Sequence, residues 1–211
     1  MIYFWFVLVA IIAYLIGSIN YSIIVSEVFM GTDIRKKGSG NAGSTNMLRN
    51  YGLKAALVTL LSDFMKTFVA TLSAWAIFSI YYPEHTLVAT ALAGLFCAIG
   101  HCFPLFFGFK GGKGVAVGAI MILMTDYRCF IIALAVFVIL VATTKYVSLG
   151  SVSAGISFPV SLALLIGFNT AGDYVRFTLA CVLALMVAIL HRLNIARLFK
   201  GTESKISFKK K

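Results

Sequence analysis

Long apolar segments separated by short polar ones fill this chain. The apolar segments are residues 2–26, 53–82, 86–107, 114–125, 129–144, 149–168 and 174–190. A helix that crosses a bilayer needs about 20 mostly apolar residues, with a range of about 17–25. Six segments reach or approach that length, whereas the fourth, residues 114–125, is short. The pattern therefore predicts an all-α membrane protein.

Composition supports this class and excludes a separate soluble domain. Of the 211 residues, 61% are hydrophobic and the mean hydropathy is +0.98, whereas soluble domains average about 45–50% apolar residues. No polar stretch approaches the roughly 50 residues of a small soluble domain. The first segment lacks a basic start and a small-residue cleavage site, so we expect a retained span and not a signal peptide.

The placement of the cations indicates whether the short fourth segment crosses. If all seven segments cross, one side carries nearly all the basic residues of the connections and tail, and the other carries only Arg128 and Arg176, with three acids. The internal cations on the first side are Arg35, Lys36, Lys37, Arg49, Lys54, Lys110, Lys113 and Lys145. If the fourth segment does not cross, Lys145 and the basic tail lie opposite residues 35–37. The positive-inside rule favours seven crossings.

We therefore predict one seven-helix membrane domain, residues 1–198, with the amino terminus outside and the carboxyl terminus in the cytoplasm. Residues 199–211 form a basic cytoplasmic tail, whose lysines we expect to be drawn to anionic membrane lipid. Nucleic-acid binding is not expected, because no folded nucleic-acid module accompanies the charge, which is +11 overall.

The most polar loop, residues 38–46, reads Gly-Ser-Gly-Asn-Ala-Gly-Ser-Thr-Asn. Its three glycines permit positive φ and close approach of the backbone to a ligand. Successive N–H groups in such a loop can bind an anion, and cations flank it on both sides. A second cluster, residues 100–116, has a glycine-rich turn with Lys110 and Lys113 before the fourth apolar segment, which is typical of anion sites at helix N-termini. The alternative for residues 38–46 is a flexible connector. The alternative for the second cluster is a positive-inside anchor formed by Lys110 and Lys113.

Other polar groups are weaker signals taken singly. Ser148 follows the fifth span and is also suited to cap the next helix. His191 and Asn194 are spaced i, i+3 and share a helical face. Asp63 and Lys66, also i, i+3, lie inside the second span, where charges either mark function or form a salt bridge between packed helices. No carboxylate cluster suits Mg²⁺ and no Cys pair suits zinc, so we expect no metal and no cofactor.

At these clusters the chain resembles the bacterial PlsY family, the membrane acyl-phosphate:glycerol-3-phosphate acyltransferases. The resemblance rests on residues 38–46, 100–116 and 145–149, and on His191, Asn194, Arg197, Gly201 and Glu203. It implies a multi-pass protein of the bacterial inner membrane whose active site faces the cytoplasm. It also implies transfer of a fatty acyl group from acyl phosphate to the sn-1 hydroxyl of glycerol 3-phosphate. The products would be lysophosphatidic acid and inorganic phosphate, in the first step of phospholipid synthesis. The oligomeric state stays open, with a monomer expected.

The resemblance also implies site residues. For acyl phosphate they are Gly40, Asn41, Gly43, Thr45 and Asn46. For glycerol 3-phosphate they are Ser39, Arg49, Lys113, Ser148, His191 and Asn194, of which Lys113, Ser148 and His191 are expected to be catalytic. Either His191 or the donor's own phosphate takes the hydroxyl proton, and both options stay open.

Three rival functions differ in their sequence requirements. An anion transporter needs polar residues along the whole pore, whereas the outer halves of these helices are apolar. An intramembrane serine protease using Ser148 or Ser151 with His191 needs a nucleophile deep in the membrane, and Ser148 is expected near the surface. A lipid-binding protein without chemistry leaves both glycine and cation loops unexplained.

Overall fold

The computed structural model describes residues 1–206, and all regular structure within that range is helical. The helices are α1 (Ile2–Gly17), α2 (Tyr21–Met30), η1 (Ile34–Lys36), α3 (Ser44–Tyr81), η2 (Pro83–His85), α4 (Thr86–Cys102), η3 (Leu105–Phe107), α5 (Val115–Thr125), α6 (Tyr127–Thr144), α7 (Val147–Leu165), α8 (Ala171–Leu190) and α9 (Arg192–Phe199). Lys209, Lys210 and Lys211 of the predicted tail lie outside the described residues.

Six helical segments are long and apolar enough to cross a membrane, which confirms the all-α membrane class. The short fourth segment is α5, with eleven residues. Its crossing, and with it the count of seven, stays a prediction, as does the orientation of the chain.

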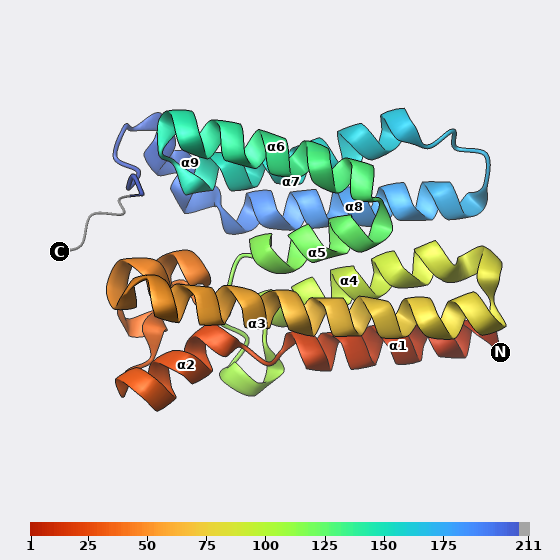
Figure 1. Ribbon diagram of the computed structural model, residues 1–211, viewed down its shortest axis with the longest axis horizontal. Coiled ribbons are helices and arrows are strands. Elements are labelled where there is room, and N and C mark those ends of the chain that lie inside the picture. Colours follow the sequence, from red (N-terminus) through yellow and green to blue (C-terminus); the bar gives the residue numbers. More distant parts are fainter. Residues whose placement is uncertain (207–211) are drawn as a thin grey trace. The chain divides into compact units, whose positions relative to one another are not determined.

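Contacts divide the chain into two compact units, Met1–Thr125 and Asp126–Lys211. In the first unit α1, α3 and α4 pack side by side, and in the second α6, α7 and α8 do so (Figure 1). The prediction of one domain over residues 1–198 stays a prediction.

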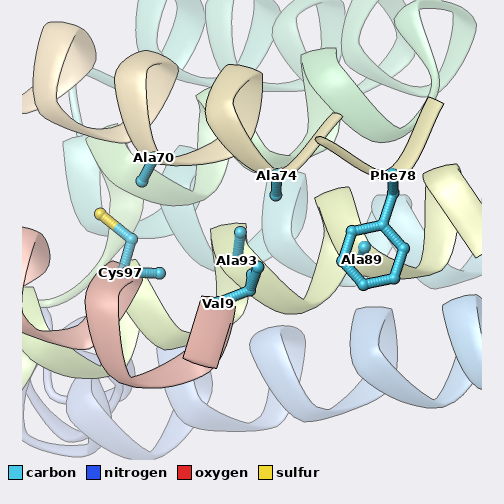
Figure 2. Packing of buried hydrophobic residues seen from close by; sticks show 8 residues of the cluster. Val9, Ala70, Ala74, Phe78, Ala89, Ala93 and Cys97 are labelled. Atoms are coloured by element: carbon cyan, nitrogen blue, oxygen red, sulfur yellow. The ribbon is translucent and has the colours of Figure 1, made fainter. Parts of the chain in front are cut away.

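Small residues bring the first-unit helices close together. Val9 of α1, Ala70 and Ala74 of α3, and Ala93 and Cys97 of α4 converge in one buried cluster (Figure 2). Between spans, where lipid offers no hydrophobic drive for association, such residues allow backbones to approach closely.

Helices α1 and α4 approach each other most closely at two glycines. A Cβ on Gly17 would overlap the carbonyl oxygen of Cys97, and a Cβ on Gly100 would overlap that of Tyr14. Because α4 is held this closely, the loop that follows it starts from a well-defined place beside the end of α1.

Two spans differ most from their predicted bounds. The first breaks between α1 and α2, where Asn20 caps α2 by accepting a hydrogen bond from the amide of Ile23 at 3.2 Å. The second begins at Ser44 instead of residue 53, but Gly52 has φ of 80° and interrupts the helix there. The apolar span therefore does start after Gly52, and a short polar helical segment precedes it.

Candidate functional site

The loop before α3 is held by the side chain of Asn46, which is 2% exposed. Its Nδ2 donates to the carbonyls of Ile34, Lys37 and Asn41 at 3.3, 3.0 and 3.0 Å. Its Oδ1 accepts from the amide of Ser39 at 3.1 Å. The side-chain amide of Asn46 thus organises the loop from within, which favours an architectural role for this residue.

Backbone geometry explains the glycines of this loop. Gly38 and Gly40 have φ of 56° and 71°, a region that other residues rarely adopt. Gly43 is the N-cap of α3, so Ser44 and Thr45 begin the helix. Their amides lack intrahelical acceptors, as at every helix N-terminus. The anion-binding potential of the loop therefore lies at the start of α3.

The second glycine-rich loop lies directly against the first. The amide of Ala42 donates to the carbonyl of Gly111 at 3.4 Å, and a Cβ on Gly112 would come within 2.9 Å of the carbonyl oxygen of Ala42. Gly114 has φ of 80° and leads into α5. Lys113 therefore lies in the short segment between Gly112, which packs against the first loop, and the start of α5. The residue is half-buried.

A clamp formed by Arg35 joins the same two loops. Arg35 Nη1 donates to the carbonyls of Phe107 and Lys110 at 2.6 and 3.1 Å, and its Nη2 pairs with Asp33 at 2.7 Å. Hydrogen bonds from Arg35 lower the pKa of the Asp33 carboxyl, so the pair remains ionised at neutral pH. The sequence shows Arg35 only as one of several flanking cations.

The predicted residues of the first unit differ in exposure. Ser39, Gly40 and Arg49 are exposed, and Asn41, Gly43 and Thr45 are partly exposed. The structure thus joins the two predicted loops of this unit by hydrogen bonds. The exposed and partly exposed residues lie on the first loop and on the first turns of α3.

In the second unit Glu203 is the centre of the predicted polar residues. Ser148 Oγ and Asn194 Nδ2 donate to its Oε1 at 2.8 and 2.7 Å, and Arg197 Nε donates to its Oε2 at 2.7 Å. Glu203 is 8% exposed. One carboxylate therefore joins the start of α7, helix α9 and the segment after α9.

This carboxylate is ionised at neutral pH. Burial opposes its ionisation, but the hydrogen bonds from Asn194, Arg197 and Ser148 outweigh that effect and lower the pKa of Glu203. Ser148 lies in the first turn of α7 behind Tyr146, the N-cap, so its hydroxyl contacts Glu203 instead of capping the helix.

His191 occupies the junction of α8 and α9 and is 4% exposed. Its Nδ1 lies 2.8 Å from the carbonyl oxygen of Val187. Because a carbonyl only accepts, Nδ1 donates this hydrogen bond, and Nε2 is the acceptor nitrogen when the ring is neutral. This tautomer suits an imidazole that receives a hydrogen bond from a substrate hydroxyl.

Sequence reasoning assigned no role to Glu203 and did not join His101 to the pair of Asp63 and Lys66. The salt bridge of that pair is confirmed, with Lys66 Nζ 2.9 Å from Asp63 Oδ1. Two signals for Glu203 were present, because it is among the residues of the family resemblance and is the only acidic residue after Asp173.

Comparison with known proteins identifies the family. The family described as Glycerol-3-phosphate acyltransferase matches residues 7–201. Proteins with that name are similar over nearly the whole chain. The one from Clostridioides difficile is 42% identical, covering 98% of both chains. One from Listeria monocytogenes is 40% identical, covering 96% of this chain and 97% of the relative. The one from Chlorobaculum tepidum is 36% identical, covering 98% of both.

Two solved structures share the fold. The glycerol 3-phosphate form of PlsY, an integral membrane glycerol 3-phosphate acyltransferase, matches with a TM-score of 0.83 at 30% identity over 96% of both chains. The lysophosphatidic acid form of PlsY matches with a TM-score of 0.80 at 29% identity, again over 96% of both chains. The chain therefore belongs to the glycerol-3-phosphate acyltransferase family and is an integral membrane acyltransferase of the PlsY type.

Proposed function

We propose that this enzyme transfers a fatty acyl group from acyl phosphate to the sn-1 hydroxyl of glycerol 3-phosphate. Lysophosphatidic acid and inorganic phosphate are the products. The observation that carries the proposal is the likeness, over 96% of both chains, to a PlsY structure in its glycerol 3-phosphate form. The lysophosphatidic acid form matches equally far along the chain.

The polar residues of the second unit suit glycerol 3-phosphate. Ser148 and Asn194 are buried and fixed by Glu203, and His191 is fixed by Val187. A hydroxyl, an amide and an imidazole acceptor match a substrate with two hydroxyl groups and a phosphate. In the proposal His191 Nε2 orients the attacking hydroxyl, and either this nitrogen or the donor's phosphate accepts its proton.

The first unit offers charge for phosphate groups. Amides at the start of α3 combine with the local positive end of the helix dipole to attract an anion. Arg49 on α3 and Lys113 before α5 add full positive charges. In the proposal Gly40, Asn41, Gly43 and Thr45 approach the phosphate of acyl phosphate, and Ser39, Arg49 and Lys113 approach glycerol 3-phosphate. Asn46 supports the loop instead of contacting the substrate.

An acyl phosphate donor fits this set of residues. Its leaving group is phosphate, which departs near neutral pH without a strong general acid. Positioning of the two substrates and stabilisation of developing charge by Lys113 and helix amides then supply most of the acceleration. The apolar helix faces that the described chain exposes provide surface for the acyl chain.

The proposal includes seven crossings with the active site facing the cytoplasm. Within the first unit the two glycine-rich loops are hydrogen-bonded, so they share a side. Within the second unit the carbonyl of Lys145 accepts from the amide of Ile206 at 2.9 Å, so these segments also share one. Whether the loops of the two units share one side of the membrane therefore depends on a crossing by α5, which is about 16 Å long at 1.5 Å per residue. The positive-inside rule favours this crossing and places the loops in the cytoplasm.

Topology is testable with a thiol reagent that does not cross membranes. In intact cells we expect it to label an Arg128→Cys variant and not a Lys110→Cys variant, because these positions lie on either side of α5, with the wild type as control for the native cysteines. Labelling of Lys110→Cys alone would reverse the orientation, and labelling of both or of neither would contradict a crossing by α5.

The activity is tested with purified protein in lipid. Acyl phosphate and glycerol 3-phosphate are added together, and lysophosphatidic acid and released phosphate are measured. Equal amounts of both products support the proposal. Phosphate release without lysophosphatidic acid, or no product beside an active control enzyme, contradicts it. Activity with only acyl-CoA would keep the acyltransferase and replace the donor.

Lys113→Ala is expected to raise KM for glycerol 3-phosphate about tenfold or more, and KM for acyl phosphate less. The physical reason is loss of a charge-assisted contact to phosphate, which is worth roughly 1.5–3 kcal/mol. Steady-state kinetics with each substrate varied in turn measures both constants. Lys110→Ala, an exposed position three residues earlier, is the matched control. An equal rise in both KM values would contradict the proposed division of the site.

A further inference from the structure

Three ionisable side chains meet inside the first unit, beside the second of the two loops proposed to bind substrate. Asp63 and Lys66 of α3 and His101 of α4 are 1%, 4% and 3% exposed. Lys66 Nζ lies 2.9 Å from Asp63 Oδ1 and 3.2 Å from His101 Nδ1, and Asp63 Oδ1 lies 3.4 Å from His101 Nδ1. Charges within membrane spans are rare and are either paired or functional.

Helix packing alone does not account for this buried cluster. Replacing a buried ion pair by apolar side chains of similar volume is often neutral or stabilising. A pair that served only to hold α3 against its neighbours would therefore have an equally good apolar substitute. Lys66 and His101 also contact backbone outside α3, and these contacts indicate that the cluster positions that backbone.

Lys66 supports the break in the first span. Its Nζ donates to the carbonyls of Gly17 and Ile19 at 3.0 and 2.7 Å, at the end of α1 and in the turn before α2. Backbone that leaves a helix within a membrane span needs such replacement partners. The ammonium group is thus anchored to α1, α3 and the turn, and its nitrogen lies 3.2 Å from Nδ1 of the His101 ring.

His101 also contacts the second glycine-rich loop. Its carbonyl accepts a hydrogen bond from the amide of Gly112 at 3.1 Å. A Cβ on Gly112 would overlap His101 Nε2, so the ring lies directly against the loop backbone. Lys113 is the next residue, and Ala42 of the first loop is hydrogen-bonded to Gly111. A shift of the ring would therefore move both loops.

We propose that Asp63, Lys66 and His101 are positioning residues for acyl transfer, acting through the backbone of Gly112 on Lys113. The inference rests on the proposed function, in which Lys113 contacts a substrate phosphate. The cluster itself contacts no substrate. Because a displacement of about 1 Å at a reacting group can lower a rate by about 100-fold, a buried charge network is a suitable support for this loop.

The test removes the cluster without leaving a lone buried charge. The double variant Asp63→Leu/Lys66→Met deletes both charges together, and His101→Leu deletes the ring separately. We expect each to fold but to lower kcat/KM for glycerol 3-phosphate by about tenfold or more. Thr59→Val, one turn from Asp63 on the buried face of α3, is the matched control and should leave kcat/KM unchanged.

Combination with Lys113→Ala separates positioning from general damage. If the cluster acts through Lys113, its loss should lower kcat/KM by less than about twofold in the Lys113→Ala background, since coupled residues are not additive. Independent losses that multiply would overturn the inference. Should the double variant fail to fold, His101→Leu and the conservative His101→Gln are each combined with Lys113→Ala in the same double-mutant cycle. His101→Gln is expected to retain more activity than His101→Leu.

Hydrogen exchange tests the inference without the reaction. In substrate-free protein, the amides of Gly111 and Gly112 should exchange faster in His101→Leu than in the wild type, whereas those of α6 should not change. Unchanged exchange in the loop would overturn the inference. A wild type that makes no lysophosphatidic acid would instead contradict the proposed function, and the exchange result would still be informative.

Discussion

His191→Ala is expected to lower kcat for lysophosphatidic acid formation by about 100-fold or more, within the range for loss of a positioned acid or base group. It should also raise KM for glycerol 3-phosphate. His191 is buried, its ring is oriented by the carbonyl of Val187, and Nε2 is the acceptor when the ring is neutral. Removing the ring therefore removes an oriented acceptor for the substrate hydroxyl.

Kinetics distinguish the two roles of this histidine. A binding and orienting role predicts changes in both kcat and KM, measured with acyl phosphate saturating and glycerol 3-phosphate varied. Loss of kcat with unchanged KM, together with disappearance of the ionisation that limits activity on one side of the pH profile, would instead assign His191 as the general base. His85→Ala is the matched control, because His85 is exposed at the turn before α4.

Glu203→Gln is expected to lower both activity and stability. The carboxylate accepts from Ser148, Asn194 and Arg197 at once. A glutamine of the same shape has one oxygen and one NH₂ group, so at least one donor faces another donor. Hydrogen bonds to a charged group contribute about 1.5–3 kcal/mol, and Arg197 is 41% exposed, so its share is reduced by solvent. We expect a loss of about 2 kcal/mol in the free energy of unfolding.

The same residue predicts a pH dependence with a definite sign. Because the folded state lowers the pKa of Glu203 below 4.5, the ionised form stabilises the fold at neutral pH. This contribution is present above the unfolded-state pKa and is lost as pH falls through the folded-state pKa. The wild type should therefore lose more stability than Glu203→Gln between neutral pH and pH values below 4.5.

Thermal unfolding in detergent at several pH values measures this difference. Glu84→Gln, at an exposed turn, is the control for removing a carboxylate. Parallel pH profiles for the wild type and Glu203→Gln would contradict a native-state role for the ionised carboxylate. Loss of stability with full activity per folded molecule would mean that Ser148 and Asn194 do not need Glu203 for their positions.

Much of the fold follows from local sequence. Spans are long apolar runs because the bilayer offers backbone groups no hydrogen-bond partners except those within a helix. Five of the seven predicted runs are therefore single long helices in the structure, the first is divided into α1 and α2, and the fourth is the short helix α5. The two glycine-rich loops were also evident, since glycine and cations at a helix start are a local pattern.

Local sequence patterns did not predict which distant residues contact each other. The break between α1 and α2 was missed, because Ser18, Ile19 and Asn20 lie within a run whose average is apolar. The salt bridge of Asp63 and Lys66 was predictable from i, i+3 spacing, whereas the third member, His101, comes from α4, 35 residues after Lys66. No periodicity links residues so far apart.

The sequence by itself determined the membrane class, the positions of the spans and loops, and the motifs that resemble the family. Those properties depend on composition and spacing within about 20 residues, the length that a bilayer imposes. Only the tertiary structure decided that Asn46 supports its loop, that Glu203 gathers Ser148 and Asn194, and that His101 lies against Gly112. Hydrogen bonds form between atoms about 3 Å apart, and only the packing of α1, α3 and α4 in one unit and of α7, α8 and α9 in the other brings such atoms together.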